Sequence, residues 1–245
     1  MGLFKRRFKI SDIISKNNDR RTKKVSVSKE HYFYRFTDEQ SISFKPEELK
    51  IMKYLADNGV PIEEPISYDA VHNEGENLAM FYKSSGLISA STFFYGVDFI
   101  ELSGKFSKFS FMSQKLLRFN YVKLRIKFFH NIINIISKMH SLKVAHNHPH
   151  TSNFVIDKNL NVKLIDFKLA KMHDGGFIDV QDKLNFFRDD YMYLFRSFRV
   201  FFGHNFSLLE MYKLLKLDGF EGKDLEYAIA WFNKDIIPYL DEFEY

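Results

Sequence analysis

Cysteine is absent from this chain of 245 residues, so neither disulfide bonds nor thiolate metal sites contribute to its structure. Proline and tryptophan are scarce, with five and one residues. No apolar run approaches the ~18–20 residues that a membrane-spanning helix requires, and the first residues lack the apolar core of a secretory signal. We therefore expect a cytoplasmic protein, long enough for one large core or two small lobes.

Positive charge exceeds negative charge, with a formal net charge of +5 and a pI near 9.1. Basic residues cluster at residues 5–9 and 20–24, and such clusters attract anionic lipid or nucleic acid. Leu3, Phe4 and Phe8 lie among the first of these, a mixture that is compatible with peripheral contact with a membrane surface. A solvated basic tail explains the charge equally well, so residues 1–24 are treated as a separate basic segment.

Short alternating segments predict a small β-sheet in the first third of the chain. Residues 25–28 and 31–36 are rich in β-branched or aromatic side chains and are separated by a charged pair, which predicts a hairpin. Residues 66–69 and 77–82 flank a polar turn and are expected to form two further strands.

One helix is predicted between these pairs of strands. Pro46 suits a first helical turn, and Glu47 and Glu48 follow where a helix N-terminus favours carboxylates. Apolar residues continue at helical spacing to Leu55, and the helix should end near Gly59.

The segments on either side of the second pair of strands read as connections. The prolines of residues 60–65 predict an extended connector, and Ser-Ser-Gly at residues 84–86 is expected to link two parts of the fold. Residues 87–120 show no single period and are assigned as helical or irregular.

The remainder of the chain is predominantly helical by pattern. An apolar stripe at three- and four-residue steps in residues 121–140 predicts a core-facing helix of about five turns. Residues from about 183 to 245 read as helices that are broken near Gly203 and Gly219.

Asn153 and Asp166 flank a predicted hairpin formed by residues 154–156 and 162–165. Phosphoryl transfer needs a divalent ion that bridges phosphates, and carboxylate and amide oxygens are suitable ligands for that ion. A loop flanked by strands can hold both side chains on one side of a cleft. Each residue alone is explained as a turn former or a strand-end cap, but the pair predicts a Mg²⁺ site.

The segment from Ile133 to Phe167 resembles the catalytic core of bacterial lipopolysaccharide-core (Kdo/heptose) kinases, within the wider protein-kinase-like fold. It has a helix ending in Met139-His140, then His146-x-His148, Asn153 five residues later, and Leu-Ile-Asp-Phe ending at Phe167. In protein kinases the corresponding loop reads His-x-Asp, with Asn five residues after the Asp. His148 therefore stands at the position of the catalytic aspartate.

The resemblance implies an α+β, two-lobed fold with a small N-terminal β-sheet lobe containing one helix, at residues 25–84. A mostly helical C-terminal lobe would occupy residues 85–245. Carried over by position, Arg35 would bind the phosphates of ATP, Glu48 would be its partner on the helix, and Asp190 would be a buried carboxylate that braces the catalytic loop. ATP and Mg²⁺ are the implied cofactors.

The chain departs from this family at sites that bear on activity. His148 replaces the catalytic Asp, Lys168 replaces the Gly after Asp166-Phe167, and no glycine-rich phosphate cover is found near residues 10–30. A neutral imidazole accepts a proton near neutral pH but lacks the negative charge of a carboxylate. General base catalysis contributes about 10²–10⁴-fold, so its loss would leave a slow enzyme or none.

His146, His148 and His150 alternate along the loop, so an extended backbone would point all three rings to one side. Three imidazoles can hold zinc or another transition metal. Ordinary hydrogen-bonding roles for loop histidines are the alternative interpretation.

Two functions therefore remain in competition. The first is a phosphotransferase that moves the ATP γ-phosphate to a hydroxyl of a lipopolysaccharide-core sugar or similar glycolipid, with peripheral contact with the inner membrane leaflet. The second is a pseudokinase that acts as a nucleotide-binding or scaffolding module. A nucleic-acid binder, based on charge alone, does not account for the spacing of Asn153 and Asp166, and no nucleic-acid partner is expected.

Overall fold

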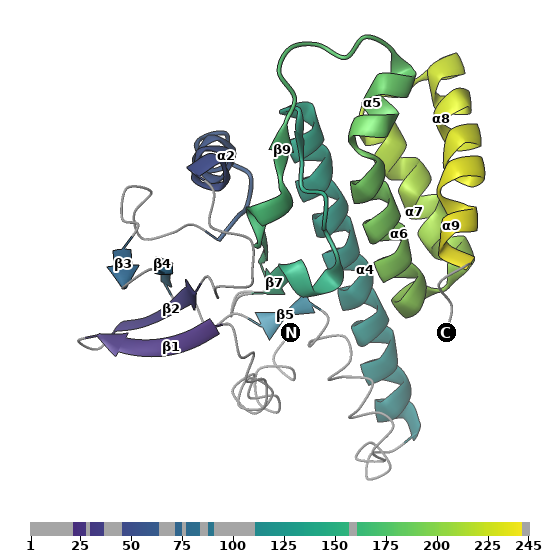
Figure 1. Ribbon diagram of the computed structural model, residues 1–245. Coiled ribbons are helices and arrows are strands. Elements are labelled where there is room, and N and C mark those ends of the chain that lie inside the picture. Colours follow the sequence, from purple (N-terminus) through teal and green to yellow (C-terminus); the bar gives the residue numbers. More distant parts are fainter. Residues whose placement is uncertain are drawn as a thin grey trace.

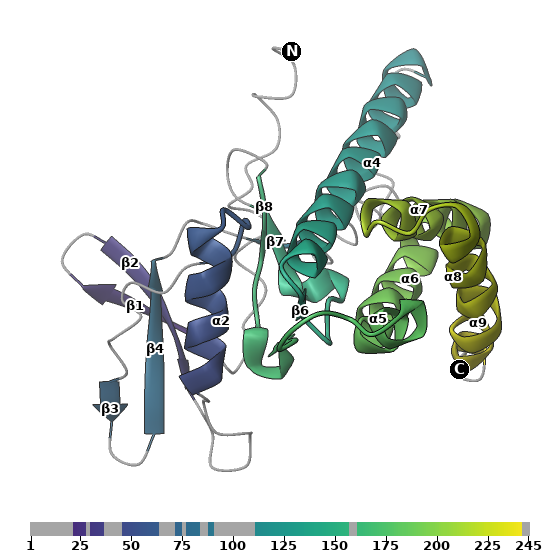
Figure 2. The ribbon, with the colours of Figure 1, turned by 90° about the horizontal axis from the view of Figure 1, so that it is seen from above.

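The computed structural model describes residues 22–27, 30–36, 46–63, 72–74, 77–83, 88–90, 111–156 and 161–241. Within them the chain has an α+β structure that is mostly helical. A small antiparallel sheet and one helix lie at one end of the molecule, and a group of helices lies at the other (Figures 1 and 2).

The small sheet contains four antiparallel strands in the order β1-β2-β4-β3. They are β1 (Thr22–Val27), β2 (Glu30–Phe36), β3 (His72–Glu74) and β4 (Asn77–Lys83). The predicted first hairpin is confirmed by β1 and β2, and the predicted strand at residues 77–82 is confirmed by β4. The strand predicted at residues 66–69 lies outside the described residues.

Helix α2 (Pro46–Asp57) begins and ends where its sequence signals place it. A turn after Asp57 ends the helix, and it contains Gly59, whose φ of 69° suits a residue without Cβ. The connector that follows is tied to strand β8 (Val162–Leu164), which is distant in sequence. The N–H of Leu164 donates to Pro61 O and the N–H of Glu63 donates to Leu164 O, both at 3.0 Å. These two bonds hold α2 beside the hairpin that ends at Asp166.

A three-stranded sheet follows, in the order β5-β7-β8. Its strands are β5 (Ile88–Ser89), β7 (Phe154–Ile156) and β8 (Val162–Leu164). The predicted hairpin is confirmed, with Phe154 opposite Leu164. Two further short strands, β6 (Val144–Ala145) and β9 (Lys171–Met172), pair with each other. Strands of two residues show no period, so β5, β6 and β9 were not predicted.

The central helix is α4 (Phe111–Ser141), which begins at residue 111 rather than at the predicted residue 121. Its described apolar stripe is buried as predicted, and it contributes Phe128, Phe129, Ile132, Ile133, Ile136 and Met139 to the main core.

The last five helices lie on one side of α4, and α7 packs directly against it (Figure 1). They are α5 (Val180–Phe186), α6 (Arg188–Phe202), α7 (His204–Leu217), α8 (Gly222–Asp235) and α9 (Ile237–Asp241). The predicted breaks near Gly203 and Gly219 are confirmed. A further break, at Phe187 between α5 and α6, was not predicted. Phe187 is a completely buried apolar residue, which in a sequence reads as the interior of a helix rather than its end. None of the described helices combines the length and apolarity needed to cross a bilayer.

Candidate active site at the loop of residues 146–153

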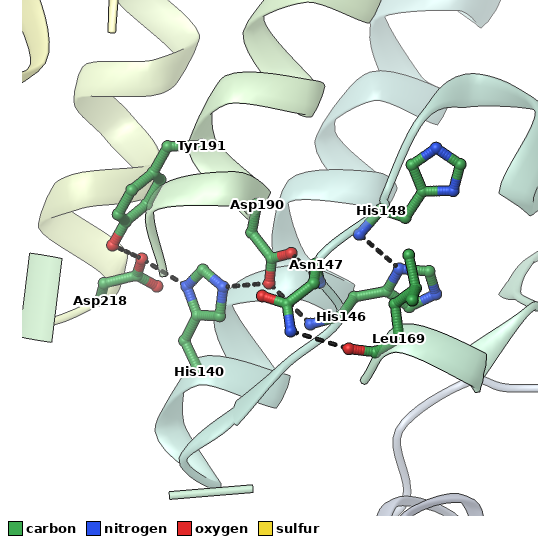
Figure 3. A network of polar contacts seen from close by, with 8 residues as sticks. All are labelled: His140, His146, Asn147, His148, Leu169, Asp190, Tyr191 and Asp218. Atoms are coloured by element: carbon green, nitrogen blue, oxygen red, sulfur yellow. Dashed lines mark hydrogen bonds and ion pairs between the residues drawn. The ribbon is translucent and has the colours of Figure 1, made fainter. Parts of the chain in front are cut away.

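The loop that follows β6 is anchored by one buried carboxylate. Asp190, in the first turn of α6, is 0% exposed. Its Oδ2 accepts the N–H of His146 at 2.9 Å, and its Oδ1 accepts the N–H of Asn147 at 2.6 Å (Figure 3). The prediction that Asp190 is buried and braces the loop is confirmed. The side chain of Asn147 adds a bond to Leu169 O at 2.8 Å, which joins the loop to the segment after Asp166.

The same carboxylate belongs to a buried group that we call the His140 network, composed of His140, Asp190, Tyr191 and Asp218. His140 Nε2 lies 3.0 Å from Asp190 Oδ2, and His140 Nδ1 lies 2.7 Å from Asp218 Oδ2. The hydroxyl of Tyr191 donates to Asp218 Oδ2 at 2.6 Å. Burial by itself lowers the pKa of His140, but the charges and hydrogen bonds of Asp218 and Asp190 outweigh it and raise the pKa to about 9. Both ring nitrogens therefore carry protons at neutral pH.

Sequence reasoning missed Tyr191 and Asp218 in this network. Asp218 lies after the last turn of α7, next to a glycine, and such a position normally reads as a helix end. Only the packing of α4, α6 and α7 brings its carboxylate to His140.

His146 connects the loop to the strand that leads to Asp166. Its Nδ1 accepts the N–H of His148 at 3.3 Å, so its Nε2 carries the proton and donates to Ile165 O at 3.0 Å. Its ring also meets the ring of Phe167 edge to face, with centroids 5.2 Å apart. Burial is the main influence on its pKa and lowers it, which agrees with a neutral ring.

Asn153 and Asp166 are brought together by the backbone. The N–H of Ile165 donates to Asn153 O at 2.9 Å, so the residue before Asp166 is bonded directly to Asn153. The side-chain Nδ2 of Asn153 donates to His148 O at 2.9 Å, which turns the amide oxygen Oδ1 away from that carbonyl. Asp166 adopts a left-handed conformation, with φ of 69° and ψ of 63°, which aspartate tolerates better than most residues.

A lysine lies against the predicted metal ligand. Lys168 Nζ is 3.4 Å from Asp166 Oδ2. No group of three or more His, Cys, Asp or Glu residues in the described part of the chain is arranged to hold a metal ion. Mg²⁺ is commonly bound by one or two protein oxygens together with substrate phosphates, so Asn153 and Asp166 stay predicted ligands of an ion that arrives with a nucleotide. They do not make a free-standing metal site.

His148 contacts both Asn153 and α6, and its Nδ1 lies 3.5 Å from Asn153 Nδ2. Its ring meets the rings of Tyr193 and His150 nearly at right angles, with centroids 4.7 and 4.3 Å apart. Partial burial is the main cause of the lowered pKa of His148. The negative charge of Asp166 raises this pKa, and the positive charge of Lys168 lowers it. The ring is therefore neutral at pH 7 and able to accept a proton.

The alternative interpretation of His146, His148 and His150 as a metal site is wrong, and the hydrogen-bonding interpretation holds for His146. His146 is fully buried and both of its ring nitrogens are used by the backbone, as described above. Asn147 adopts a left-handed φ of 63°, so the loop is not extended and the alternation that would align the rings is broken. Among the described residues no such cluster is capable of holding a metal.

The structure describes the side chain of only one member of the predicted phosphate-binding pair, Glu48 and not Arg35. Glu48 is 5% exposed in the first turn of α2, and α2 packs against the short helix η4 (Phe167–Leu169) that follows Asp166. Arg35 lies in β2 opposite Met80, but its side chain lies outside the described part of the structure. The pairing of the two side chains therefore stays a prediction.

Comparison of the chain with protein-family models and with curated proteins finds no match.

Proposed function

We propose that the protein is an ATP-dependent phosphotransferase with a two-lobed, protein-kinase-like fold. The observation that carries the proposal is the loop anchored by Asp190, because it holds Asn153 beside the strand end that bears Asp166. In this proposal the sheet and α2 form the smaller lobe, and the helical part from residue 85 onward forms the larger one. A hydroxyl of a lipopolysaccharide-core sugar or similar glycolipid is the acceptor.

Asn153 and Asp166 would hold Mg²⁺ together with the phosphates of ATP, while Arg35 and Glu48 would act on the nucleotide from the smaller lobe. When bound, the ion would offset the negative charge of the phosphates. Lys168, only 3.4 Å from Asp166, would compete with that ion for the carboxylate. Because of this competition, Mg²⁺ would bind weakly in the absence of nucleotide.

His148 would act as the general base. The acceptor hydroxyl oxygen forms a bond to the γ-phosphorus, the bond from that phosphorus to the β,γ-bridging oxygen breaks, and ADP leaves. The hydroxyl proton passes to the neutral imidazole of His148 and then to solvent. Because the imidazole has no negative charge before the proton arrives, we expect slower turnover than with a well-placed carboxylate, by less than the about 10²–10⁴-fold that general base catalysis contributes in total.

Basic and apolar residues of segment 1–24 would contact the anionic inner membrane leaflet, where a glycolipid acceptor is embedded. The Phe-rich segment with Phe106, Phe109, Phe111 and Met112 would touch its acyl chains. Both contacts fall outside the residues whose side chains the structure describes. Their support is the sequence pattern.

A second candidate function is a pseudokinase that binds nucleotide or a partner protein without phosphoryl transfer. Two observations favour it: His148 occupies the position of the catalytic aspartate, and the Lys168 ammonium is already paired with Asp166.

Calorimetric titration with ATP and Mg²⁺, followed by a transfer assay, tests the proposal. We expect the wild type to bind Mg²⁺-ATP and to transfer phosphate slowly, and Asp166→Ala and His148→Ala to lose transfer. Asp174→Ala, an exposed carboxylate in the loop after β9, is the matched control and should leave both unchanged. An absence of ATP binding in the wild type would rule out the phosphotransferase and a pseudokinase that binds nucleotide. If transfer is absent from the wild type and arises in His148→Asp, the pseudokinase is correct.

A further inference from the structure

The three histidines of the loop differ in what occupies their ring nitrogens. His146 uses both nitrogens, because Nδ1 accepts the N–H of His148 and Nε2 donates to a backbone carbonyl. His150 caps the short helix η3 (Thr151–Asn153), and its Nδ1 accepts the N–H of Ser152 at 3.1 Å. Among the described residues, the ring of His148 has no bond to the backbone, and in Figure 3 it lies outside the His140 network. The ring with an available lone pair in this loop is therefore that of His148.

The lone pair of His148 lies on Nδ1. Asn153 Nδ2 donates to His148 O at 2.9 Å, which fixes the orientation of the amide, and the same Nδ2 lies 3.5 Å from His148 Nδ1. Because an amide nitrogen is a donor and never an acceptor, Nδ1 faces a donor and carries no proton, and the proton is on Nε2. At 3.5 Å the contact is long, so it engages the lone pair only weakly.

This nitrogen adjoins the predicted Mg²⁺ ligands. Nδ1 of His148 faces the amide nitrogen of Asn153, and the oxygen of the same amide is the predicted ligand. Burial is the first influence on the pKa of His148 and the charges of Asp166 and Lys168 follow, so both of these side chains lie within electrostatic range of the ring. The proposed function brings the γ-phosphate of ATP to this group of residues. A nucleophilic nitrogen is therefore present where a phosphoryl group is expected to arrive.

Lys168 supplies a positive charge for a phosphoryl group on this ring. Its ammonium lies 3.4 Å from Asp166 Oδ2, and its side chain is 30% exposed. Mg²⁺ bound by Asp166 would displace the lysine, and an ammonium then pairs well with phosphate oxygens. His148 and Lys168 are two positions at which the loop and the strand end depart from the kinase pattern, and a single chemistry accounts for both departures.

We propose that His148 accepts the γ-phosphoryl group of ATP on Nδ1 when no acceptor hydroxyl is present, so that the protein phosphorylates itself on this histidine. The inference rests on the proposed function, because Asn153 and Asp166 must hold the nucleotide with its ion. The Nδ1 lone pair forms a bond to the γ-phosphorus, the bond from that phosphorus to the β,γ-bridging oxygen breaks, and ADP leaves. The proton on Nε2 then passes to solvent.

The phosphorylated ring reacts further with a hydroxyl of water or of the acceptor. The hydroxyl oxygen bonds to the phosphorus, the N–P bond breaks, and the hydroxyl proton passes to Nδ1. These steps restore a neutral imidazole. Without an acceptor we expect slow ATP hydrolysis through phosphohistidine, and we expect labelled ADP to exchange into ATP because the first step is reversible.

Incubation of the full chain with Mg²⁺ and γ-labelled ATP tests the inference. Rapid quenching in alkali should trap a phosphate that is stable to alkali and labile to acid, and mass spectrometry should place it on His148. His148→Gln should lower both this label and the exchange of ADP into ATP by at least about tenfold, with unchanged ATP affinity. His204→Gln removes an exposed histidine at the start of α7 and is the matched control, which should leave both signals unchanged.

Three results would overturn the inference in a wild type that binds ATP. They are an acid-stable label, a label on another histidine, and the absence of both label and exchange. The exchange reaction matters for the last of these, because it detects a phosphohistidine that is hydrolysed too quickly to accumulate.

A small phosphoryl donor separates this inference from the proposed function. Phosphoramidate phosphorylates accessible imidazoles without ATP or Mg²⁺. It should label His148 roughly tenfold faster than His146 or His150, whose lone pairs are each held by a hydrogen bond. Equal rates at the three rings would overturn the assignment of the lone pair, and with it the inference.

The two proposals then fail in different ways. If the wild type binds ATP but shows neither label nor exchange, self-phosphorylation is wrong and the nucleotide site stands. If phosphoramidate labels His148 selectively but ATP does not bind, the phosphotransferase is wrong, and with it the transfer from ATP to this histidine.

Discussion

The carboxylate of Asp190 interacts with three groups at the loop and in the His140 network. Its two oxygens accept the N–H groups of His146 and Asn147, and Oδ2 also faces the ring of His140. The carboxylate, His140 and His146 are buried and Asn147 is partly buried, so solvent has little access to replace the carboxylate if it is lost. The position of the loop therefore depends on one side chain from α6.

Replacement of Asp190 by alanine should lower the free energy of unfolding by about 3–5 kcal/mol, because it leaves the buried His140 charge without one of its two partners. Urea denaturation measures this difference. Asp189→Ala is the matched control, since Asp189 is the adjacent carboxylate and is exposed. Equal destabilisation by the two substitutions would contradict the anchoring role.

Lys168 is a second residue whose effect can be isolated, because its ammonium lies 3.4 Å from Asp166 in a position that is 30% exposed. Partly exposed ion pairs contribute up to about 1 kcal/mol, so removal of the charge should tighten Mg²⁺-ATP binding roughly two- to fivefold. Calorimetry on Lys168→Met with and without EDTA measures the change, and Lys171→Met is the control. A gain that persists in EDTA would show that the lysine does not compete with Mg²⁺.

At the scale of elements, the break between α6 and α7 determines where Asp218, at the end of α7, lies relative to α6. α6 carries Asp190 in its first turn and Tyr193, whose ring meets the ring of His148, in the next, and it stops at Gly203. Gly203 has φ of 79° and ψ of 168°, a conformation that residues with Cβ rarely adopt. The break lets α7 turn back and bring Asp218 to His140.

Gly203→Ala should therefore lower the free energy of unfolding by about 1–3 kcal/mol through backbone strain alone, because a Cβ at this position meets no atom within 4 Å. Gly176→Ala is the matched control: it also has open space around a Cβ and its φ is not in the positive range. Urea denaturation of both variants measures the difference, and a neutral Gly203→Ala would show that the α6–α7 junction adjusts without strain.

At the scale of the whole molecule, the His140 network links three helices through one buried charge. The pKa of His140 in the folded protein, about 9, lies above the ordinary value of about 6.5 in the unfolded chain. The folded state therefore binds this proton more tightly. The resulting stabilisation is fully present below about pH 6.5 and is lost as the pH rises through about 9.

We expect the free energy of unfolding to fall by roughly 2 kcal/mol between about pH 7.5 and about pH 9, from the shift of His140 alone. Loop histidines His146, His148 and His150 have lowered pKa values and titrate below this range. Urea denaturation across the range measures the slope, and the difference between wild type and His140→Gln isolates it. A parallel decline in both proteins would assign the effect to other groups.

Local signals in the sequence determined much of this protein. Pro46 and Gly59 bounded α2, the apolar stripe identified the buried part of α4, and the polar turn between two apolar segments predicted the hairpin of β7 and β8. These features depend on contacts between near neighbours in the chain, so periodicity and turn chemistry are sufficient to find them. The burial of Asp190 was predicted from the resemblance, and the structure agrees.

Only the tertiary structure decided which distant groups meet. The two-residue strands β5, β6 and β9 and the pairing of His140 with Asp218 all join segments far apart in sequence. The left-handed backbone at Asn147 was also decided by tertiary contacts, because hydrogen bonds to Asp190 and Leu169 hold this residue. This turn prevents His146, His148 and His150 from facing one metal ion. Such contacts leave no periodic trace in the sequence, because their energies come from burial and hydrogen bonding that exist only once the helices have packed.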